Sequence, residues 1–472
     1  MRPRVAVHDG SSAFSRRVPL IVAAAFFMET LDSTIVLTAL PAIAQSLGEP
    51  TLSLTASITV YLVAMAVFVP TAGWASARFG ARKLFAVAVG VFTLASLLCG
   101  LSPSLGTLLT ARVLQGAAAA FMSPVGRLVV LRETPKHRII DAIGLIVWPA
   151  LIAPVIGPPL GGFITTYASW RWIFLINVPL GILGVLLVLR FVPKHAEKAV
   201  APFDVTGFVL TAVALASLIH GLSLVADRAG SEMAGGVYLA VGIASGAAAI
   251  RHALRHPSPM LDLRAVRVPT FQLSTVSAGF LARIAISMTP FLLPLMFQIG
   301  FGASSFEAGL MLLVYMAGNL AMKSMTTPIL RRFGFRNVLK INGLLCVACL
   351  AVCGLLSPGV PQSVAYVVLF GAGLTRSMHF TCAATLAFAD VSEEARPGAT
   401  TLATMAQQTA GALGVALAAL ALGASQALRA GATLALPDFQ HALWAGAGLI
   451  ALAVAWMLRL APDAGAELSK RP

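Results

Sequence analysis

Fourteen stretches of the chain are almost continuously apolar, and short polar segments separate them. Most exceed the roughly 18 residues that a helix needs to cross a bilayer. They lie at 18–47, 52–76, 84–102, 106–131, 141–166, 172–192, 205–226, 235–251, 270–298, 306–330, 338–357, 362–389, 398–425 and 438–460. The shortest, 235–251, is rich in Gly and Ala. The pattern therefore predicts an all-α polytopic membrane protein with fourteen transmembrane helices.

Composition agrees with this prediction and sets the orientation. Hydrophobic residues make up 58% and charged residues 11% of the 472 positions, whereas a soluble domain carries roughly 25% charge. The formal net charge of +15 does not indicate nucleic-acid binding, because that would need a basic face on a soluble fold. We assign the excess of Lys and Arg to cytoplasmic loops. If the N-terminus is inside, the basic clusters fall in inner loops, which predicts an even number of spans and both termini in the cytoplasm. The acidic loop 390–396 is the exception.

A passage of the chain occurs twice, which indicates an internal duplication. Leu40-Pro41-x-x-x-Gln45 precedes Arg78-Phe79-Gly80-Ala81-Arg82, and Leu293-Pro294-x-x-x-Gln298 precedes Arg332-Phe333-Gly334-Phe335-Arg336. The offset is 253 or 254 positions throughout. Membrane proteins built from two related halves bind a ligand between the halves and work by rocking one against the other. A transporter for a small molecule is therefore the leading expectation.

The duplication also predicts the organisation of the chain. We expect two six-helix bundles, with two extra helices inserted between them. The predicted parts are a cytoplasmic tail 1–17, a first bundle 18–192, a linker with two helices 193–269, a second bundle 270–460 and a cytoplasmic tail 461–472. The N-terminus is basic and an apolar run follows it, which is also the pattern of a cleaved signal peptide. The first apolar run belongs to the repeated unit, however, so we expect it to be retained.

Several motifs resemble the fourteen-helix drug/proton antiporter branch of the major facilitator superfamily. They are Leu31-Asp32-Ser33-Thr34-Ile35-Val36, the loop Gly73 to Lys83, Arg112-Val113-Leu114-Gln115-Gly116, Gly157-Pro158-Pro159-Leu160-Gly161-Gly162 and Ser169 to Pro179. The resemblance covers the whole chain. It implies a major facilitator fold in the inner membrane of a bacterium and proton-coupled multidrug efflux by alternating access. It implies no cofactor besides the proton gradient, and a monomer, with association with other efflux components left open.

The resemblance assigns conformational roles to a set of motif residues. They are Gly73, Arg78, Gly80, Arg82, Gly157, Pro158, Gly161, Gly162, Arg332, Gly334 and Arg336. The chain departs from the family pattern at Leu37, Ala77 and Ala153. Ala77 replaces the Asp that, in the family, helps to latch the two halves together on the cytoplasmic side, so we expect a weak latch. Ordinary Gly-mediated packing is the alternative role for Gly157, Gly161 and Gly162.

Two acidic residues and one arginine in the spans are candidates for proton coupling. Glu29 and Asp32 lie three positions apart on one helix face, and Arg112 is the natural cation for them. A charge at mid-membrane costs about 2.5–3.5 kcal/mol on insertion scales, so it is seldom placed there without a role. We expect Asp32 to load and release a proton. The alternative is a static Asp32–Arg112 pair that holds two helices together.

The second half carries cations in its spans without acidic residues to pair with them, namely Arg283, Lys323 and Arg376, with His379 nearby. If they face one cavity, its field is positive and favours anions. Alternatively, Lys323 reaches the inner surface and Arg376 bonds to backbone carbonyls. The full set of predicted cavity residues is Glu29, Gln115, Arg283, Gln298, Asn319, Lys323, Arg376 and His379. The substrate is thus a drug, or alternatively an organic anion or anionic metal chelate.

Other classes of function find little support. Cys346, Cys349 and Cys353 share a helix face without a His or carboxylate nearby, so we expect them to pack as small hydrophobes and predict no metal site. No G-x-x-x-x-G-K-[ST] loop is present, which excludes ATP as the energy source. A membrane-embedded enzyme would need a clustered nucleophile, a metal set or paired His residues in the spans, and the sequence shows none of these. A non-transporting membrane sensor would be expected to add a soluble signalling domain.

Overall fold

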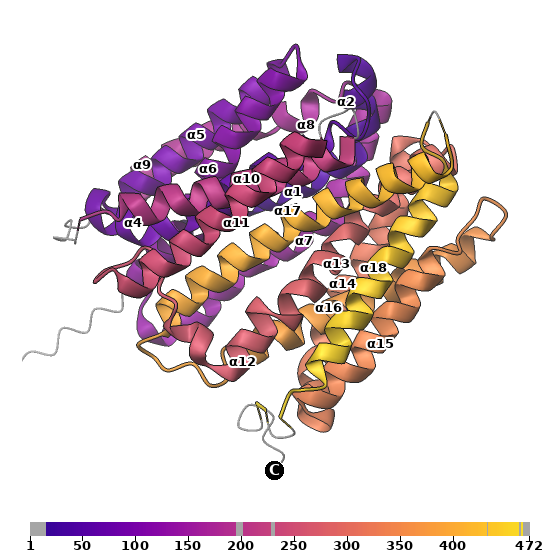
Figure 1. The fold of residues 1–472 in the computed structure, drawn as a ribbon. Coiled ribbons are helices and arrows are strands. Elements are labelled where there is room, and N and C mark those ends of the chain that lie inside the picture. Colours follow the sequence, from indigo (N-terminus) through magenta and orange to yellow (C-terminus); the bar gives the residue numbers. More distant parts are fainter. Residues whose placement is uncertain (1–15, 195–201, 228–231, 432, 462–463, 466–472) are drawn as a thin grey trace, which may run out of the picture.

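The computed structural model describes residues 16–194, 202–227, 232–431, 433–461 and 464–465, and the regular elements among them are helices (Figure 1). The first half contains α1 (Arg17–Ile35), α2 (Leu40–Leu47), α3 (Thr55–Phe68), α4 (Ala72–Phe79), α5 (Ala81–Leu101), α6 (Leu105–Glu133), α7 (Ile139–Tyr167), α8 (Trp172–Leu175) and α9 (Asn177–Phe191). The inserted pair is α10 (Val205–Asp227) and α11 (Glu232–Arg255).

The second half contains α12 (Pro269–Phe271), α13 (Ala278–Leu295), α14 (Ser305–Phe333), α15 (Phe335–Cys353), α16 (Gln362–Ala387), α17 (Arg396–Leu428) and α18 (Leu436–Met457). Short 3-10 or π segments join some of these helices, at Val36–Thr38, Val69–Thr71, Lys136–Arg138, Arg264–Arg267, Gln272–Val276 and Met296–Gly300. Most of the predicted tails 1–17 and 461–472, and residues 195–201 of the predicted linker, lie outside the described residues.

Each of the fourteen predicted spans corresponds to a helical segment, which confirms the all-α polytopic architecture. Within the described part of the chain, thirteen segments are long and apolar enough to cross a membrane. The remaining predicted span, 362–389, corresponds to α16, whose Arg376 and His379 lower its mean hydropathy. The shortest predicted span, 235–251, corresponds to α11, which is longer than predicted.

The duplication seen in the sequence recurs in the backbone and side chains. Gly80 and Gly334 both have a positive φ, of 80° and 74°, where one helix ends and the next begins. Arg82 Nη2 donates to a carbonyl near the end of α9, and Arg336 Nη2 donates to the Leu458 carbonyl after α18 (3.5 Å). In each half, the second Arg of the repeated loop therefore joins that loop to the last helix of its bundle.

Among the described residues, a small cluster joins Val67 of α3 to Met405 of α17, but the most extensive hydrophobic core shared by the two halves lies at one end of the molecule. This end, called the closed end here, carries the turns after α2, α5, α7, α13 and α17. Its core combines Ile43 and Phe174 of the first half with Leu292, Leu312 and Phe439 of the second half.

At the opposite end, most of the packing lies within one half or the other. This end, called the basic end here, carries the Arg78–Lys83 and Arg331–Arg336 loops. One cluster there belongs to α1, α5, α6 and their neighbours, and another to α13, α15, α16 and α18. Figure 1 shows α4 and α12 well apart at this end. The molecule is therefore closed at one end and opens toward the end with the basic loops.

Candidate functional site

A fully buried polar network surrounds Asp32 on α1. Its carboxylate accepts hydrogen bonds from Arg112 Nη1 (2.6 Å), Gln115 Nε2 (2.8 Å) and Asn177 Nδ2 (3.0 Å). These four side chains are each at most 1% exposed. The network joins α1 to α6 and to the start of α9, all within the first half. The predicted pairing of Asp32 with Arg112 is thus present in the structure.

The Arg112 guanidinium has several further partners. Its Nε donates to the Ser57 carbonyl (3.1 Å) and its Nη1 donates to Gln115 Oε1 (2.7 Å). The charged carbon lies 4.3 Å from the Tyr61 ring centre and 5.7 Å from that of Phe174. Buried ion pairs are tolerated when their remaining donors and acceptors are bonded, and aromatic faces add attraction for the cation. Removing either charge would leave the other buried without its counter-ion.

Glu29 lies one turn before Asp32 on α1, but it has different partners. Its two carboxyl oxygens lie 2.9 and 3.1 Å from Ser123 Oγ of α6, and the residue is 7% exposed. Among the described residues, no Lys or Arg nitrogen forms an ion pair with it. Glu29 is therefore a buried carboxyl group with a hydroxyl partner and no bonded cation, unlike Asp32.

Arg283 of α13 is buried, and no carboxylate of the described residues pairs with it. Its Nη1 donates to the Ser274 carbonyl (2.7 Å), which belongs to the π segment that precedes α13, and its guanidinium lies 5.7 Å from the Phe380 ring centre. His379 is 2% exposed, and neither of its ring nitrogens has a hydrogen-bond partner within the described part of the chain. Bonding to a backbone carbonyl, which was the alternative expected for Arg376, is thus seen for Arg283.

Lys323 and Arg376 lie between α14 and α16. Lys323 Nζ donates to Thr381 Oγ1 (2.7 Å), so its ammonium group is held against α16. The Arg376 guanidinium lies 5.6 Å from the Tyr315 ring centre and 3.6 Å from Met316 Sδ. The ion pairs of the described residues include neither cation. The second half therefore holds several cations in its spans that hydroxyl, carbonyl or aromatic groups stabilise.

The glycine motif at 157–162 allows close packing on both sides of α7. A Cβ added at Gly157 would collide with Thr34 of α1, and one at Gly161 with the Ile35 carbonyl. One added at Gly162 would collide with the Ser305 carbonyl of α14 and lie 2.8 Å from Phe306 Cα. These glycines let α7 contact α1 on one side and the second half on the other.

Two hydrogen bonds reinforce the same contact between the halves at the closed end. Gln298 Nε2 donates to the Thr38 carbonyl (3.1 Å), and the Phe306 backbone N–H donates to Thr166 Oγ1 (3.2 Å). Thr38 Oγ1 in turn donates to the Pro158 carbonyl of the motif (3.3 Å). Gln298, predicted to line the cavity, is thus part of the closure in this conformation.

The remaining predicted residues differ in their positions. Gln115 is 0% exposed inside the Asp32 network, so in this conformation it does not face open space. Asn319 is half-buried on α14, next to Gly373 of α16. Gly73 is exposed on α4, and a Cβ there would meet no atom within 4 Å, so it carries no close packing in this state. Ala77 is half-buried on the same helix.

Sequence reasoning missed several members of the network. Asn177 is 0% exposed and bonded to Asp32, although it stands within the Ser169–Pro179 stretch that carried part of the resemblance. Ser96 Oγ accepts from Gln115 Nε2 (2.8 Å), and Ser123 contacts Glu29. No feature of the sequence marks a serine in an apolar run as a partner of a distant carboxylate, because the contact depends on how the helices pack.

Two related six-helix halves, an inserted helix pair and an opening at one end define the class of secondary membrane transporters. The family model described as "Major Facilitator Superfamily" matches residues 22–415. The chain therefore belongs to the major facilitator superfamily, as its motifs predicted.

The chain is similar in sequence to curated bacterial proteins. It is 38% identical over 403 residues to "Putative multidrug resistance protein MdtD" of Pectobacterium carotovorum, covering 85% of this chain and 86% of the relative. It is also 38% identical over 405 residues to the protein of the same name from Escherichia coli O6:H1, covering 85% of each chain.

Solved structures show the same fold at low sequence identity. A D-xylose-proton symporter matches with a TM-score of 0.69 at 14% identity, covering 98% of this chain and 100% of the other. The inward-facing, unoccupied form of a bacterial homologue of human Spinster matches with a TM-score of 0.67 at 16% identity and the same coverage. The predicted major facilitator fold is confirmed.

Proposed function

We propose that this protein is a proton-coupled antiporter that exports small organic molecules by alternating access. The observation that carries the proposal is the pair of buried carboxyl groups on α1, Asp32 and Glu29, in a molecule whose two halves share their most extensive described core at the closed end. Intramembrane ionisable groups of this kind mark proton relays in transporters. The multidrug resistance name of the MdtD relatives supports drugs as the substrate class. The positive-inside rule supports a cytoplasmic location for the basic end and for both termini.

The contacts supply a route from protonation to movement. A proton on Asp32 removes the charge that holds Arg112, Gln115 and Asn177 around it, so α1 loses part of its attachment to α6 and α9. The same helix packs through Ile35 against Gly161 of α7, whose next residue contacts the second half. Changes at Asp32 are therefore coupled to the contact between α7 and α14, which must open for the closed end to release substrate.

Transport by the purified protein in liposomes tests the proposal. A pH step across the membrane should drive movement of a dye panel by the wild type, and Asp32→Asn should abolish this driven movement because an amide cannot cycle a proton. Exchange of substrate without a pH gradient should persist in Asp32→Asn, which shows that the variant is folded. Asp141→Asn is the control, because Asp141 is 57% exposed in the first turn of α7, where it pairs with Arg138.

The outcomes separate the two carboxyl groups. If Asp32→Asn keeps full driven transport and Glu29→Gln loses it, Glu29 carries the proton and Asp32 is structural. If both variants respond to the pH step as the wild type does, or if the wild type ignores the step, the protein is not a proton antiporter.

The cations of the second half favour a second candidate, the export of an organic anion or anionic metal chelate. Arg283, Lys323 and Arg376 have no bonded carboxylate among the described residues. A bound anion would offset the cost of holding these charges in the membrane. Anionic dyes therefore belong in the transport panel beside cationic ones, and preference for either charge decides between the two candidates.

A further inference from the structure

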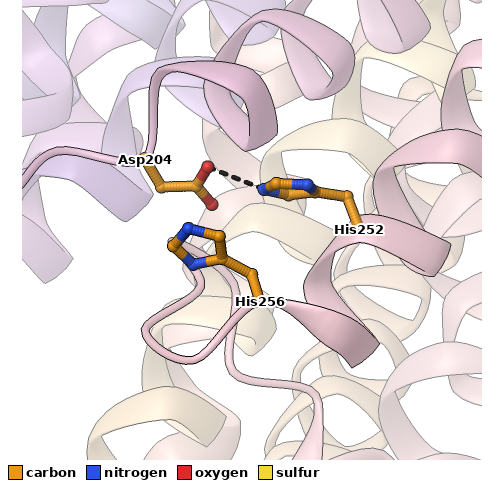
Figure 2. A group of neighbouring side chains, drawn as sticks. All are labelled: Asp204, His252 and His256. Carbon is orange, nitrogen blue, oxygen red and sulfur yellow. Dashed lines mark hydrogen bonds and ion pairs between the residues drawn. The ribbon is translucent and has the colours of Figure 1, made fainter.

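The inner ends of the inserted helix pair hold three metal-ligand side chains that the transport proposal does not use. Asp204 immediately precedes α10, His252 lies in the last turn of α11, and His256 directly follows α11. One ligand atom from each lies within 4.8 Å of the others. Figure 2 shows both imidazole rings turned toward the Asp204 carboxylate.

Local structure fixes this carboxylate in place. Asp204 Oδ1 accepts from the Gly207 backbone N–H (2.9 Å) at the first turn of α10, and Oδ2 accepts from the Met260 backbone N–H (3.0 Å). Oδ2 keeps a further lone pair for another partner, whereas His252 Nε2 (2.8 Å) already takes the second position on Oδ1. The residue is 7% exposed, yet it faces two rings rather than an apolar wall. The carboxylate is thus oriented before any ligand arrives.

The histidines are spaced to act together. His252 and His256 are four positions apart, which places them on one face at the end of a helix. Their ring centres lie 5.0 Å apart with planes inclined by 32°. His252 Nε2 lies 2.8 Å from Asp204 Oδ1, while His256 Nδ1 accepts a long bond (3.3 Å) from the Ser258 backbone N–H. Both rings are partly exposed, so an ion from the surrounding water can reach them.

We propose that Asp204, His252 and His256 bind a divalent transition-metal ion of the Zn²⁺ type. Imidazole nitrogen with a carboxylate oxygen is a donor set that suits zinc, and three protein ligands leave a fourth position for water. Ligand atoms about 2.0–2.1 Å from a tetrahedral ion lie roughly 3.3 Å from one another. Asp204 Oδ1 and His252 Nε2, which are 2.8 Å apart, must separate by about 0.5 Å as the ion replaces their hydrogen bond. His256 must close by a side-chain rotation that gives up its bond to Ser258.

The bound ion clamps the inserted pair to its exit linker. Its ligands come from the start of α10 and the end of α11, and Asp204 also holds Met260 in the segment that leads to the second half. Two residues later, Asp262 lies against Gly398 at the start of α17. The metal therefore stiffens the connection between α10, α11 and the second half. In this proposal the ion has a structural role. The proposed site differs from the sequence-based prediction, which contained no metal site.

Metal binding by the full-length protein, with any histidine tag removed, tests the proposal. After treatment with a chelator, equilibrium dialysis against Zn²⁺ should give one tightly bound ion per chain, and Co²⁺ should give a visible spectrum typical of tetrahedral coordination. Asp204→Asn and His256→Ala should each weaken Zn²⁺ binding by roughly tenfold or more. Zn²⁺ should raise the melting temperature of the wild type and of neither variant, because a ligand that binds only the folded state stabilises it.

The variants are chosen so that folding does not obscure the result. Asn is as good a helix N-cap as Asp, and His256 lies outside α11. His137→Ala is the matched control, because His137 is an exposed histidine on another loop of the basic end. Equal Zn²⁺ affinity in the wild type, Asp204→Asn and His256→Ala would overturn the proposal. So would a wild type that retains no Zn²⁺, in which case the cluster is only a hydrogen-bonded helix cap.

Discussion

At the scale of single residues, the two halves treat their intramembrane charges differently. The first half neutralises Arg112 with Asp32 and completes the network with side-chain amides. The second half holds Arg283 against a backbone carbonyl and Lys323 against a hydroxyl. An unpaired buried cation is expensive in a membrane, so such groups usually face a ligand or a cavity. Substitution of the cations in the second half can therefore test which substrate charge the protein prefers.

Arg376→Gln gives the sharpest test of substrate charge. Arg376 contacts Tyr315 and Met316, and the amide of Gln fills a similar position without the cation. If the cavity recruits anions, the variant should lower the rate of anion export by about tenfold, since one lost charge interaction of roughly 1.4 kcal/mol is a factor of ten. Export of cationic dyes should change little.

The control is Arg331→Gln, which removes an exposed arginine at the far end of α14. Strong export of cationic dyes by the wild type, with the same preference in Arg376→Gln, would leave the drug-exporter proposal in place and remove the anionic one.

At the scale of helices, the packing of α7 between α1 and α14 controls the closed end. Glycines on its two sides bring backbones into contact, and overpacking of such a site typically costs about 1–3 kcal/mol. α7 also contains four prolines, Pro149, Pro154, Pro158 and Pro159, each of which lacks a backbone donor. The helix is therefore suited to deform when the two halves move relative to each other.

Gly162→Ala should destabilise the closed end. The added methyl group would collide with the Ser305 carbonyl, so α7 and α14 must separate there. We expect slower transport and greater access of membrane-impermeant thiol reagents to a cysteine placed at Phe306. Gly144→Ala on the same helix is the matched control, because a Cβ at Gly144 meets no atom within 4 Å. Equal reagent access in the two variants would show that Gly162 does not hold this contact.

At the scale of the whole molecule, the structure is open at the end where the family's latch would act. The loop from Gly73 to Lys83 lies there, with Ala77 in place of the latch Asp. The larger hydrophobic clusters of this end belong to one half each. The only shared core of comparable extent among the described residues lies at the closed end. A weak latch is consistent with this distribution of contacts.

Ala77→Asp should shift the population toward closure of the basic end. The new carboxylate would be close to Arg78 and Arg82 in sequence and could meet the facing helix end, which adds attraction that the native chain lacks. Distances between spin labels at Lys83 and Glu393 should shorten in the variant. Cys349 should first be replaced by Ala, because it is the one cysteine that is not buried. Ala77→Asn is the uncharged control, and identical distance distributions in both variants would refute the role of the charge.

The sequence alone determined the membrane class, the helix positions and the two-fold repetition. Long apolar runs, basic loops and the repeated Pro-to-Arg passages are local properties of the chain, and the bilayer leaves a helix as almost the only way to bury such runs. The pairing of Asp32 with Arg112 was predictable for a similar reason, because two opposite charges in hydrocarbon have few other partners.

Only the tertiary structure decided which groups share a site. Asn177 reaches Asp32 from 145 positions away, and Asp204 meets His252 across an inserted helix pair. Contacts over such separations depend on helix rotation and crossing, to which uniformly apolar faces give no guide. The same holds for the closed end, because its glycines mark close packing in the sequence but do not name the helix that fills the space. The chain thus specifies its helices locally, and their packing specifies the sites.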